Sequence, residues 1–374
     1  MIEQLAQRTQ CIDSSGIRKV FALAANLDDP INFSIGQPDF EVPEPIKQAA
    51  IDAIQSGCNR YSQTAGDAVL LERLTADAQD EFGWDKPAAL ITSGVSGGLL
   101  LTFLALIDPG DEVIIPDPYF VIYKHVINML GGKCVFVDSY PNFDLPVEGI
   151  RQAITARTKL IIVNSPCNPT GQVYPAQQLE ALAQIVQQHN IIVMSDEIYR
   201  SFSYDSACTS IADYYEKTLV LRGFGKAYAV TGWRLGYMVA HSCLQALMEA
   251  MIKIQQYTFV CAPAPFQQAA LAALDLDITP LVQAYHTKRD RLYEGLASSF
   301  KIIRPGGAFY AFVAAPGGNA SAFVEQAIEN NVLVIPGNVF SEQDTHFRLS
   351  YAASDDKIRQ GAEVLCRLAA QWPG

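Results

Sequence analysis

Short apolar runs alternate with longer amphipathic stretches through the middle of the chain. Between about residues 88 and 240, the runs are apolar on both faces and are separated by segments of helical length. This pattern predicts a mostly parallel β-sheet with helices on both faces. The predicted strands are ALIT, EVIIP, CVFV, KLIIV, IIVMS, TLVLR and LGYMVA. Helices are predicted over 96–107, 119–130, 147–156 and 175–189, the last with Pro175 in its first turn.

The rest of the chain predicts a second, smaller α+β unit. Residues 243–299 have helical periodicity. They are followed by the run KIIRPGGAFYAFVAA, a helix near 320–330, the run HFRLSYA and a final helix over 355–370. Residues 14–40 are expected to pack with this unit. We therefore expect an N-terminal segment over 1–45, a large α/β domain over 46–275 and a small α+β domain over 276–374.

The net charge of the chain disfavours nucleic acid and membranes as binding partners. The chain has 374 residues, and its 39 acidic and 27 basic side chains give a net charge of -12. This charge repels nucleic-acid phosphates and anionic lipid heads, so we expect neither nucleic acid nor membrane as a partner. The opening sequence MIEQLAQRTQ lacks the pattern of an export signal, and no run of about 18 residues is free of polar groups. We therefore expect a cytoplasmic protein.

Cysteine and histidine give no sequence support for a metal site. The eight cysteines form no Cys-x-x-Cys pair, and the five histidines are equally dispersed. We interpret the cysteines as buried, small apolar side chains rather than as disulfides or zinc ligands. They are Cys11, Cys58, Cys134, Cys167, Cys208, Cys243, Cys261 and Cys366, and the histidines are His125, His189, His241, His286 and His346.

The segment LITSGVSGGLL places a glycine turn between a predicted strand and a predicted helix. Backbone N–H groups of Val95, Ser96 and Gly97 at a helix N-terminus could bind a phosphate, with the Ser96 hydroxyl as a further donor. The same residues match G-x-S-x-G, the nucleophile turn of α/β-hydrolases. That alternative needs an acid and a histidine, such as Asp196 or Asp275 with His346, and no HGGG-type segment precedes the serine.

Polar residues also follow other predicted strands. In NSPCNPTGQ, prolines fix the backbone and leave Asn164 and Asn168 as directed hydrogen-bonding groups, although such a sequence is often only a turn. Asp196 ends an apolar run, where a carboxylate either meets a cation or caps a helix.

The run GFGKAYAVTGWRLGY contains a lysine among small residues. Desolvation there would lower the pKa of Lys226 and supply a neutral amine that attacks a carbonyl, whereas the alternative is a structural ion pair. Arg234 follows eight residues later. Ser96 and Arg234 suit a phosphate, Lys226 a carbonyl, and Asp196 a protonated ring nitrogen. Pyridoxal phosphate carries all three groups.

Eight segments occur in an order that resembles the fold-type I, class I/II pyridoxal-phosphate aminotransferases, the group that includes aspartate aminotransferase. They are SIGQPDF, RYSQTAG, ITSGVSGGL, DPYFVIY, NSPCNPTGQVY, SDEIY, GFGKAYAVTGWRLGY and FRLSYAAS, and they span residues 34–354. The resemblance implies the fold of that family, pyridoxal 5'-phosphate as cofactor, and a homodimer with shared active sites in which residues 1–45 also contact the partner subunit.

The resemblance also implies roles for single residues. Lys226 would form the Schiff base and move the proton of the substrate α-carbon, and Asp196 would keep the ring nitrogen protonated. The other implied cofactor contacts are Asn168 and Tyr199 at the phenolic oxygen, Phe120 (or its neighbour Tyr119) on the ring face, and Val95, Ser96, Gly97, Arg234 and the second subunit's Tyr61 at the phosphate. The implied substrate contacts are Arg348 at the α-carboxylate, Asn168 and the backbone of Gly36.

One departure from the family pattern concerns the phosphate. The family usually has serine three residues before the lysine and often one directly before it, whereas this chain has Gly223 and Gly225. A missing charge-assisted hydrogen bond costs about 1.5 to 3 kcal/mol. We therefore expect weaker cofactor retention unless Arg222 or water supplies the donor.

The implied reaction is ping-pong transfer of an amino group from an L-amino acid to a 2-oxo acid. Both a neutral or aromatic and an aspartate-type substrate stay open. Some aspartate-specific relatives carry lysine where this chain has Ser96, and Val95, Tyr119, Phe120 and the segment Ile12 to Val20 would suit an apolar side chain. A carbon–sulfur β-lyase, which shares the same lysine, aspartate and arginines, is the alternative within this cofactor class. A non-catalytic binding module is disfavoured because all these residues occur together.

Overall fold

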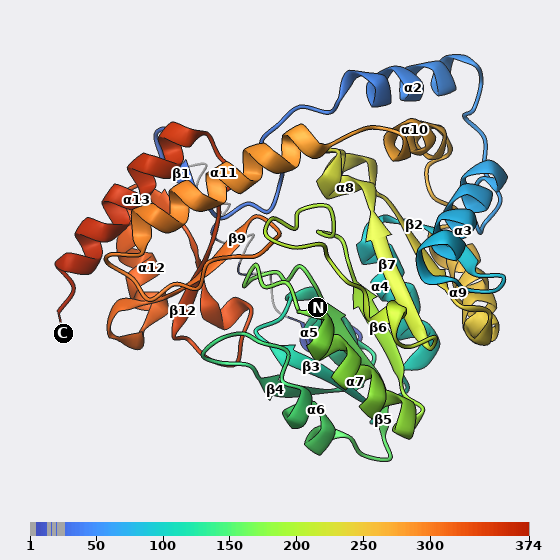
Figure 1. Ribbon diagram of the computed structural model, residues 1–374, viewed down its shortest axis with the longest axis horizontal. Helices are drawn as coiled ribbons and strands as arrows, with labels where there is room; N and C mark the ends of the chain where they lie inside the picture. The colour runs from blue at the N-terminus through green and yellow to red at the C-terminus, as the bar shows by residue number, and fades with distance from the viewer. Residues whose placement is uncertain (1–4, 13–15, 17–19, 21–26, 374) are drawn as a thin grey trace.

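The chain folds into two packed units, of which the larger surrounds a seven-stranded sheet (Figure 1). The computed structural model describes residues 5–12, 16, 20 and 27–373. The strand order of the large sheet is β2-β8-β7-β6-β5-β3-β4, and all neighbours are parallel except β8, which is antiparallel to both β2 and β7. The strands are β2 (Ala88–Ser93), β3 (Glu112–Asp117), β4 (Lys133–Asp138), β5 (Thr158–Asn164), β6 (Ile192–Asp196), β7 (Thr218–Gly223) and β8 (Leu235–Ala240).

Helices cover both faces of this sheet, which explains why its strands are apolar on both sides. Along β5, Leu160 and Ile162 pack in a core with residues of α4, α5 and α9, whereas Ile161 and Val163 pack with residues of α6 and α7. Successive side chains of a strand point to opposite faces, so both faces of the sheet are buried. These helices are α4 (Gly94–Leu106), α5 (Ile122–Met129), α6 (Val147–Ala153), α7 (Ala176–His189) and α9 (Gln245–Thr258).

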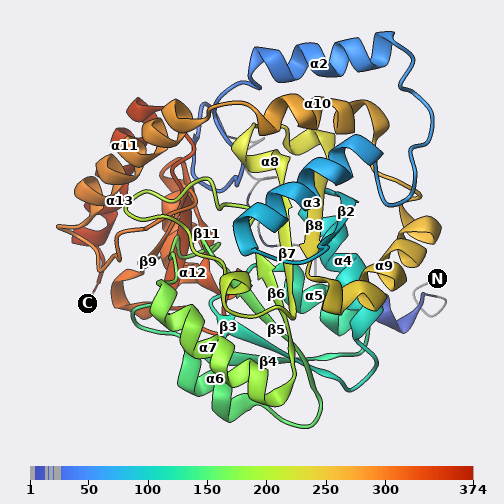
Figure 2. The ribbon, with the colours of Figure 1, turned by 45° about the vertical axis from the view of Figure 1, so that its right-hand side comes forward.

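Further helices lie at the edge of the larger unit, and one short helix follows β7. In Figure 2, α2 runs beside α10, and Ile46 and Ala50 of α2 share a core with Ala269 and Ala273 of α10. The bounds of these helices are α2 (Glu44–Gln55), α3 (Ala68–Phe82), α8 (Phe224–Ala227) and α10 (Ala264–Leu274). The Asp67 carboxylate caps α3 by accepting the N–H groups of Val69 and Leu70.

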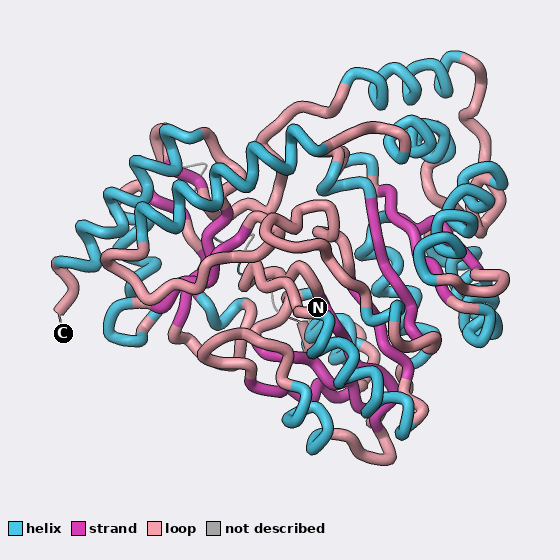
Figure 3. The backbone as a smooth tube through the Cα atoms, in the orientation of Figure 1, coloured by secondary structure: helices cyan, strands magenta, loops and turns pink. Residues whose placement is uncertain are grey.

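The smaller unit is built on a three-stranded antiparallel sheet of order β11-β12-β9, which forms a second group of strands in Figure 3. Helices α11 and α13 lie side by side (Figure 1). Strand β1, from the N-terminal segment, pairs in parallel with β10. The elements are β1 (Ile31–Asn32), α11 (Thr279–Leu296), β9 (Tyr310–Ala314), α12 (Ala320–Glu329), β10 (Val332–Leu333), β11 (Ile335–Pro336), β12 (His346–Ser350) and α13 (Asp355–Ala370).

The observed fold confirms the predicted α/β class and every predicted strand of the large sheet. Three helix starts differ, and the helix predicted from residue 96 begins two residues earlier, at Gly94. The helix predicted from residue 119 begins at Ile122, because the Tyr119 N–H instead donates to the Phe340 carbonyl oxygen at 2.7 Å. Pro175 precedes α7 as its N-cap residue rather than lying in the first turn.

Part of the predicted N-terminal segment lies outside the described residues, namely 1–4, 13–15, 17–19 and 21–26. The domain boundaries near residues 45 and 275 stay a prediction. In the described part of the chain, every helix is too short or too polar to cross a bilayer.

Candidate active site

A cavity of about 250 Å³ lies between the two units, beyond the carboxyl ends of the parallel strands. This is the usual position of a ligand site in an open α/β sheet. Most of the predicted site residues line it, and they come from loops that are distant in sequence. Those residues are Gly36, Val95, Ser96, Phe120, Asn168, Asp196, Tyr199, Lys226, Arg234 and Arg348.

Lys226 enters the cavity from α8, directly after β7. Its Nζ donates a hydrogen bond to the carbonyl oxygen of Gly36. Burial, and then the positive charges of Arg348 and Arg234, lower the pKa of the Lys226 amine from 10.5 to about 8. The fraction of neutral, nucleophilic amine at pH 7 is therefore about one in ten, compared with about one in 3,000 for a lysine whose pKa is not lowered. The geometry thus supplies the reactive amine that the sequence predicts.

The lowered pKa of Lys226 predicts how the protein reacts with a small aldehyde. Only the neutral amine attacks a carbonyl, so the rate of borohydride-trapped modification at Lys226 should rise with pH and reach half its maximum near pH 8. Peptide mass mapping of trapped samples at several pH values measures this rate. Lys159, whose side chain is 51% exposed, serves as the internal control for a surface lysine. A midpoint for Lys226 above pH 10 would contradict the prediction.

Asp196 is the last residue of β6, and only 2% of its surface is exposed. Its Oδ2 accepts a hydrogen bond from the Tyr123 hydroxyl at 2.7 Å. Burial raises the pKa of the Asp196 carboxyl to about 6, against the opposing effects of Tyr123 and the Ile198 N–H. The residues directly after Asp196 form turns rather than a helix, so the N-cap alternative is wrong. A buried carboxylate of this kind is suited to a cationic ligand.

A candidate anion site lies where α4 begins. The Ser93 side chain does not cap α4, so N–H groups of its first turn are free to face a ligand. Gly94 has φ 66°, and a Cβ there would lie 2.7 Å from Arg234 Nη2, so glycine lets the guanidinium approach this turn. Ser96 and Val95 line the cavity, whereas Gly97 does not. The helix N-terminus and Arg234 together match the predicted phosphate site.

Arg222 does not replace the missing serine donors. Its Nη1 and Nη2 bind Glu81 at 2.6 and 2.8 Å, and its Nε donates to Glu197 at 2.9 Å. Of the two possible replacement donors, Arg222 and water, Arg222 is disfavoured because these two carboxylates hold its guanidinium. Gly225 and Thr231 both line the cavity, and Thr231 is the residue that a side chain at position 225 would meet first.

Arg348 lies on β12, the central strand of the small sheet, and is 1% exposed. Its Nη1 donates to Asn168 Oδ1 at 3.1 Å and its Nη2 to the Ser34 carbonyl oxygen at 2.7 Å. The guanidinium stacks between the rings of Tyr310 and Phe340, at 4.6 and 4.4 Å from their centroids. Within the described residues, its Nε has no hydrogen-bond partner, and no carboxylate acts on its charge. This buried cation is arranged to receive an anion from a ligand.

The structure adds residues that sequence reasoning missed. Tyr310 lines the cavity, and its hydroxyl lies 2.8 Å from the Tyr199 hydroxyl. Tyr123, which is fully buried on α5, orients Asp196. Tyr123 stands within the DPYFVIY motif, three residues after Phe120, and this spacing was a usable signal because the two would share a helical face. Tyr310 had no comparable signal, since its strand is apolar throughout.

Of the aromatic residues Tyr61, Tyr119 and Phe120, each considered as a cofactor contact, only Phe120 lines the cavity. Phe120 lines the cavity, whereas Tyr119 stacks on Phe136 and donates to Glu342 at 2.7 Å. Phe120 is therefore the better ring-stacking candidate. Tyr61 is 84% exposed and does not line the cavity of its own chain.

Asn164 does not act as a free donor. Its side chain donates to the Asp196 carbonyl oxygen at 2.9 Å and accepts the Asn168 N–H at 2.9 Å. It thereby joins the ends of β5 and β6 and shapes the loop that carries Asn168.

The hydrolase alternative finds no triad among the described residues. Ser96 lines the cavity, but His346 stacks on the Phe312 ring with centroids 5.2 Å apart and lies in a different depression. Asp275 pairs with Arg73 at 2.8 Å on the surface. A nucleophilic serine needs its base within hydrogen-bond reach, so this arrangement disfavours a hydrolase.

Comparisons with known proteins agree with this geometry. The family described as aminotransferase class I and II matches residues 28–365. A probable aspartate aminotransferase of Methanocaldococcus jannaschii is 38% identical over 371 residues, which cover 96% of this chain and 98% of that protein. Aromatic-amino-acid aminotransferase 2 of Thermococcus litoralis is 32% identical and covers 96% of each chain. The solved structure of Thermus thermophilus aspartate aminotransferase with maleate has a TM-score of 0.92 and 36% identity, covering 97% of this chain and 99% of that one.

Proposed function

The chain belongs to the class I and II aminotransferase family and is an enzyme of the transaminase type, and from this premise we propose that it binds pyridoxal 5'-phosphate in the cavity around Lys226. The observation that carries the proposal is the convergence on one cavity of a low-pKa lysine, a buried aspartate and a buried arginine whose Nε has no hydrogen-bond partner among the described residues. We further propose ping-pong transfer of the amino group from an L-amino acid to a 2-oxo acid.

The residues present fit this cofactor. The α4 N-terminus, Ser96 and Arg234 would hold its phosphate, and Asp196 would face its ring nitrogen. Asn168 and Tyr199 would contact its phenolic oxygen, and Phe120 its ring face. When bound, pyridoxal phosphate supplies a carbonyl carbon for amines and a conjugated ring that withdraws electrons from the substrate α-carbon.

Three side chains of the cavity would carry out proton transfer, substrate binding and control of the ring charge. The Lys226 amine would move the proton between the substrate α-carbon and the cofactor carbon that carries the carbonyl, for which its lowered pKa is suited. Arg348 binds the α-carboxylate, and Asn168 and the stacked rings of Tyr310 and Phe340 fix the plane of its guanidinium. Asp196, oriented by Tyr123, holds a proton on the ring nitrogen through its negative charge.

Substrate choice is the open part of this function. The relatives' names include both aspartate and aromatic amino acids. The test is therefore a panel of L-amino acids that includes both, added singly to the cofactor-loaded protein while its absorption spectrum is recorded. An aminotransferase converts to the aminated form and releases the matching 2-oxo acid, and it needs an oxo-acid acceptor for turnover. Release of ammonia and pyruvate without an acceptor would instead identify a carbon–sulfur β-lyase.

A Gly225→Ser variant is expected to bind the cofactor about tenfold more tightly, because one charge-assisted hydrogen bond to the phosphate is restored. A Cβ at Gly225 would lie 3.5 Å from the Thr231 Cα, its nearest neighbour apart from the residues next to it in sequence. This distance is ordinary van der Waals contact. Equilibrium dialysis of the cofactor measures the dissociation constant.

The matched control is Gly223→Ser. A Cβ at Gly223 would lie 3.0 Å from Ile198 Cδ1 and 3.1 Å from Val95 Cγ2, which is crowded. This variant should therefore be destabilised and gain no affinity. Equal cofactor affinity in the wild type and in Gly225→Ser would show that the cavity already satisfies the phosphate by another donor.

We also propose a homodimer in which the partner's copy of Tyr61 completes the phosphate site. The 84% exposure of Tyr61 supports this assignment. The measurement is the mass of the protein in solution by light scattering, together with the cofactor affinity of Tyr61→Phe.

A further inference from the structure

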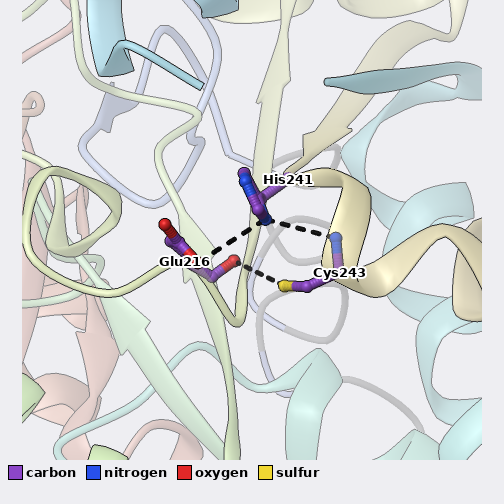
Figure 4. A group of neighbouring side chains, drawn as sticks. All are labelled: Glu216, His241 and Cys243. Atoms are coloured by element: carbon purple, nitrogen blue, oxygen red, sulfur yellow. Dashed lines mark hydrogen bonds and ion pairs between the residues drawn. The ribbon is translucent and has the colours of Figure 1, made fainter. Parts of the chain in front are cut away.

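Three potential metal ligands meet on the surface, at the end of the β7–β8 ladder (Figure 4). Glu216 precedes β7, and His241 and Cys243 follow β8. One carboxylate oxygen, one imidazole nitrogen and one sulfur all lie within 4.8 Å of one another. None of the three residues lines the active-site cavity.

The antiparallel pairing of β7 with β8 creates this cluster. Leu219 lies opposite Ala240, and continuing the same register outward brings Glu216 opposite Cys243. The Cys243 Sγ accordingly contacts the Glu216 carbonyl oxygen at 3.6 Å. The ligand-bearing segments are therefore held by a strand ladder rather than by a free loop.

His241 is the most firmly placed of the three. Its side chain is 16% exposed and packs against the Trp84 ring, with centroids 6.0 Å apart. Its Nδ1 accepts the Cys243 N–H at 3.2 Å and lies 3.8 Å from Glu216 Oε2. Because a backbone N–H donates to it, Nδ1 carries a lone pair and no proton, which is the form that binds a metal.

The donor set favours one class of ion. Sulfur and imidazole nitrogen with one carboxylate suit Zn²⁺, whereas Ca²⁺ and Mg²⁺ require oxygen ligands. Tetrahedral Zn²⁺ with bonds of about 2.0 to 2.3 Å needs ligand atoms roughly 3.3 to 3.8 Å apart. The Glu216 side chain is 68% exposed and can rotate to close the remaining distance.

We propose that Glu216, His241 and Cys243 form a surface site for Zn²⁺ or a similar borderline-soft divalent cation, with water as the fourth ligand. The ion takes the His241 Nδ1 lone pair in place of the long hydrogen bond from Cys243 N–H. The Cys243 thiol loses its proton to solvent on binding, so one proton is released for each ion bound. The bound ion links the start of β7 to the end of β8.

Cobalt(II) is the probe that tests the site, because a thiolate ligand gives it a sulfur-to-metal charge-transfer band. We expect the cofactor-loaded protein to bind one Co²⁺ per chain with this band in difference spectra, and Zn²⁺ to displace it. Cys243→Ser should abolish the band, and His241→Ala should weaken binding about tenfold or more. Cys11→Ser, which removes another exposed cysteine, should leave both unchanged.

Two outcomes would overturn the site: a wild-type protein that gives no charge-transfer band, or a band that survives Cys243→Ser. The spectra do not depend on turnover, and the metal-free enzyme should keep its full transaminase activity. The metal site and the proposed function can therefore fail independently.

Discussion

A Lys226→Ala variant is expected to lose transamination by on the order of 10⁴-fold or more, because it lacks both the attacking amine and the group that moves the α-carbon proton. Lys226 is the cavity residue whose pKa burial lowers to about 8. Steady-state assay with the preferred amino acid measures the loss. Borohydride trapping with an aldehyde should also label no peptide that contains position 226.

The controls for this prediction separate a specific loss from a general one. Lys159→Ala removes a half-exposed lysine and should keep wild-type activity. Ser96→Ala removes one phosphate donor and should reduce cofactor affinity while leaving the loaded enzyme partly active. An inactive Ser96→Ala beside an active Lys226→Ala would instead revive the hydrolase interpretation.

The large sheet and much of the cavity could be predicted because both depend on local patterns. Strands buried on both faces are apolar throughout, so a polar residue that ends one marks the ligand edge. Asp196 ends β6 in this way, and Lys226 follows β7. The immediate sequence neighbours of both residues single them out, but they left open a helix cap for Asp196 and a structural ion pair for Lys226.

What the sequence could not predict depends on contacts between distant segments. Tyr310 and Phe340 flank Arg348 only because β9, η7 (Gly337–Val339) and β12 pack together in the smaller unit. The cluster of Glu216, His241 and Cys243 could not be predicted either, because it also depends on how distant segments pair. A mostly parallel sheet does not indicate which strand reverses, and only the antiparallel β8 brings residues 216 and 243 together.

Hydrophobic periodicity also assigned Tyr119 and Phe120 to a helix that begins only at Ile122. Tyr119 and Phe120 both fit the predicted helix, yet they precede it. Phe120 faces the cavity and Tyr119 faces Glu342. Local pattern identified the motif but could not decide between these neighbours.

Arg348→Met is expected to reduce kcat/KM for every amino acid by about 10² to 10⁴-fold, since two charge-assisted hydrogen bonds to the α-carboxylate, each about 1.5 to 3 kcal/mol, are lost. The same variant should be at least as stable as the wild type without substrate. In the described part of the chain, the guanidinium is buried beside neutral partners and no carboxylate, and burial lowers its pKa. Replacing such a charge with an apolar side chain of similar length removes a desolvation cost.

Arg289→Met is the matched control, because Arg289 is equally buried but fully paired. It binds Asp205 at 2.7 Å, Asp290 at 2.5 Å and the Pro305 carbonyl oxygen at 2.6 Å. Its loss should lower the free energy of unfolding by about 1 to 3 kcal/mol and change kcat/KM little. Urea unfolding and steady-state kinetics of the two variants give the comparison. If Arg348→Met were instead destabilised as much as Arg289→Met, the Arg348 guanidinium would be a structural group, and the α-carboxylate would have to bind elsewhere in the cavity.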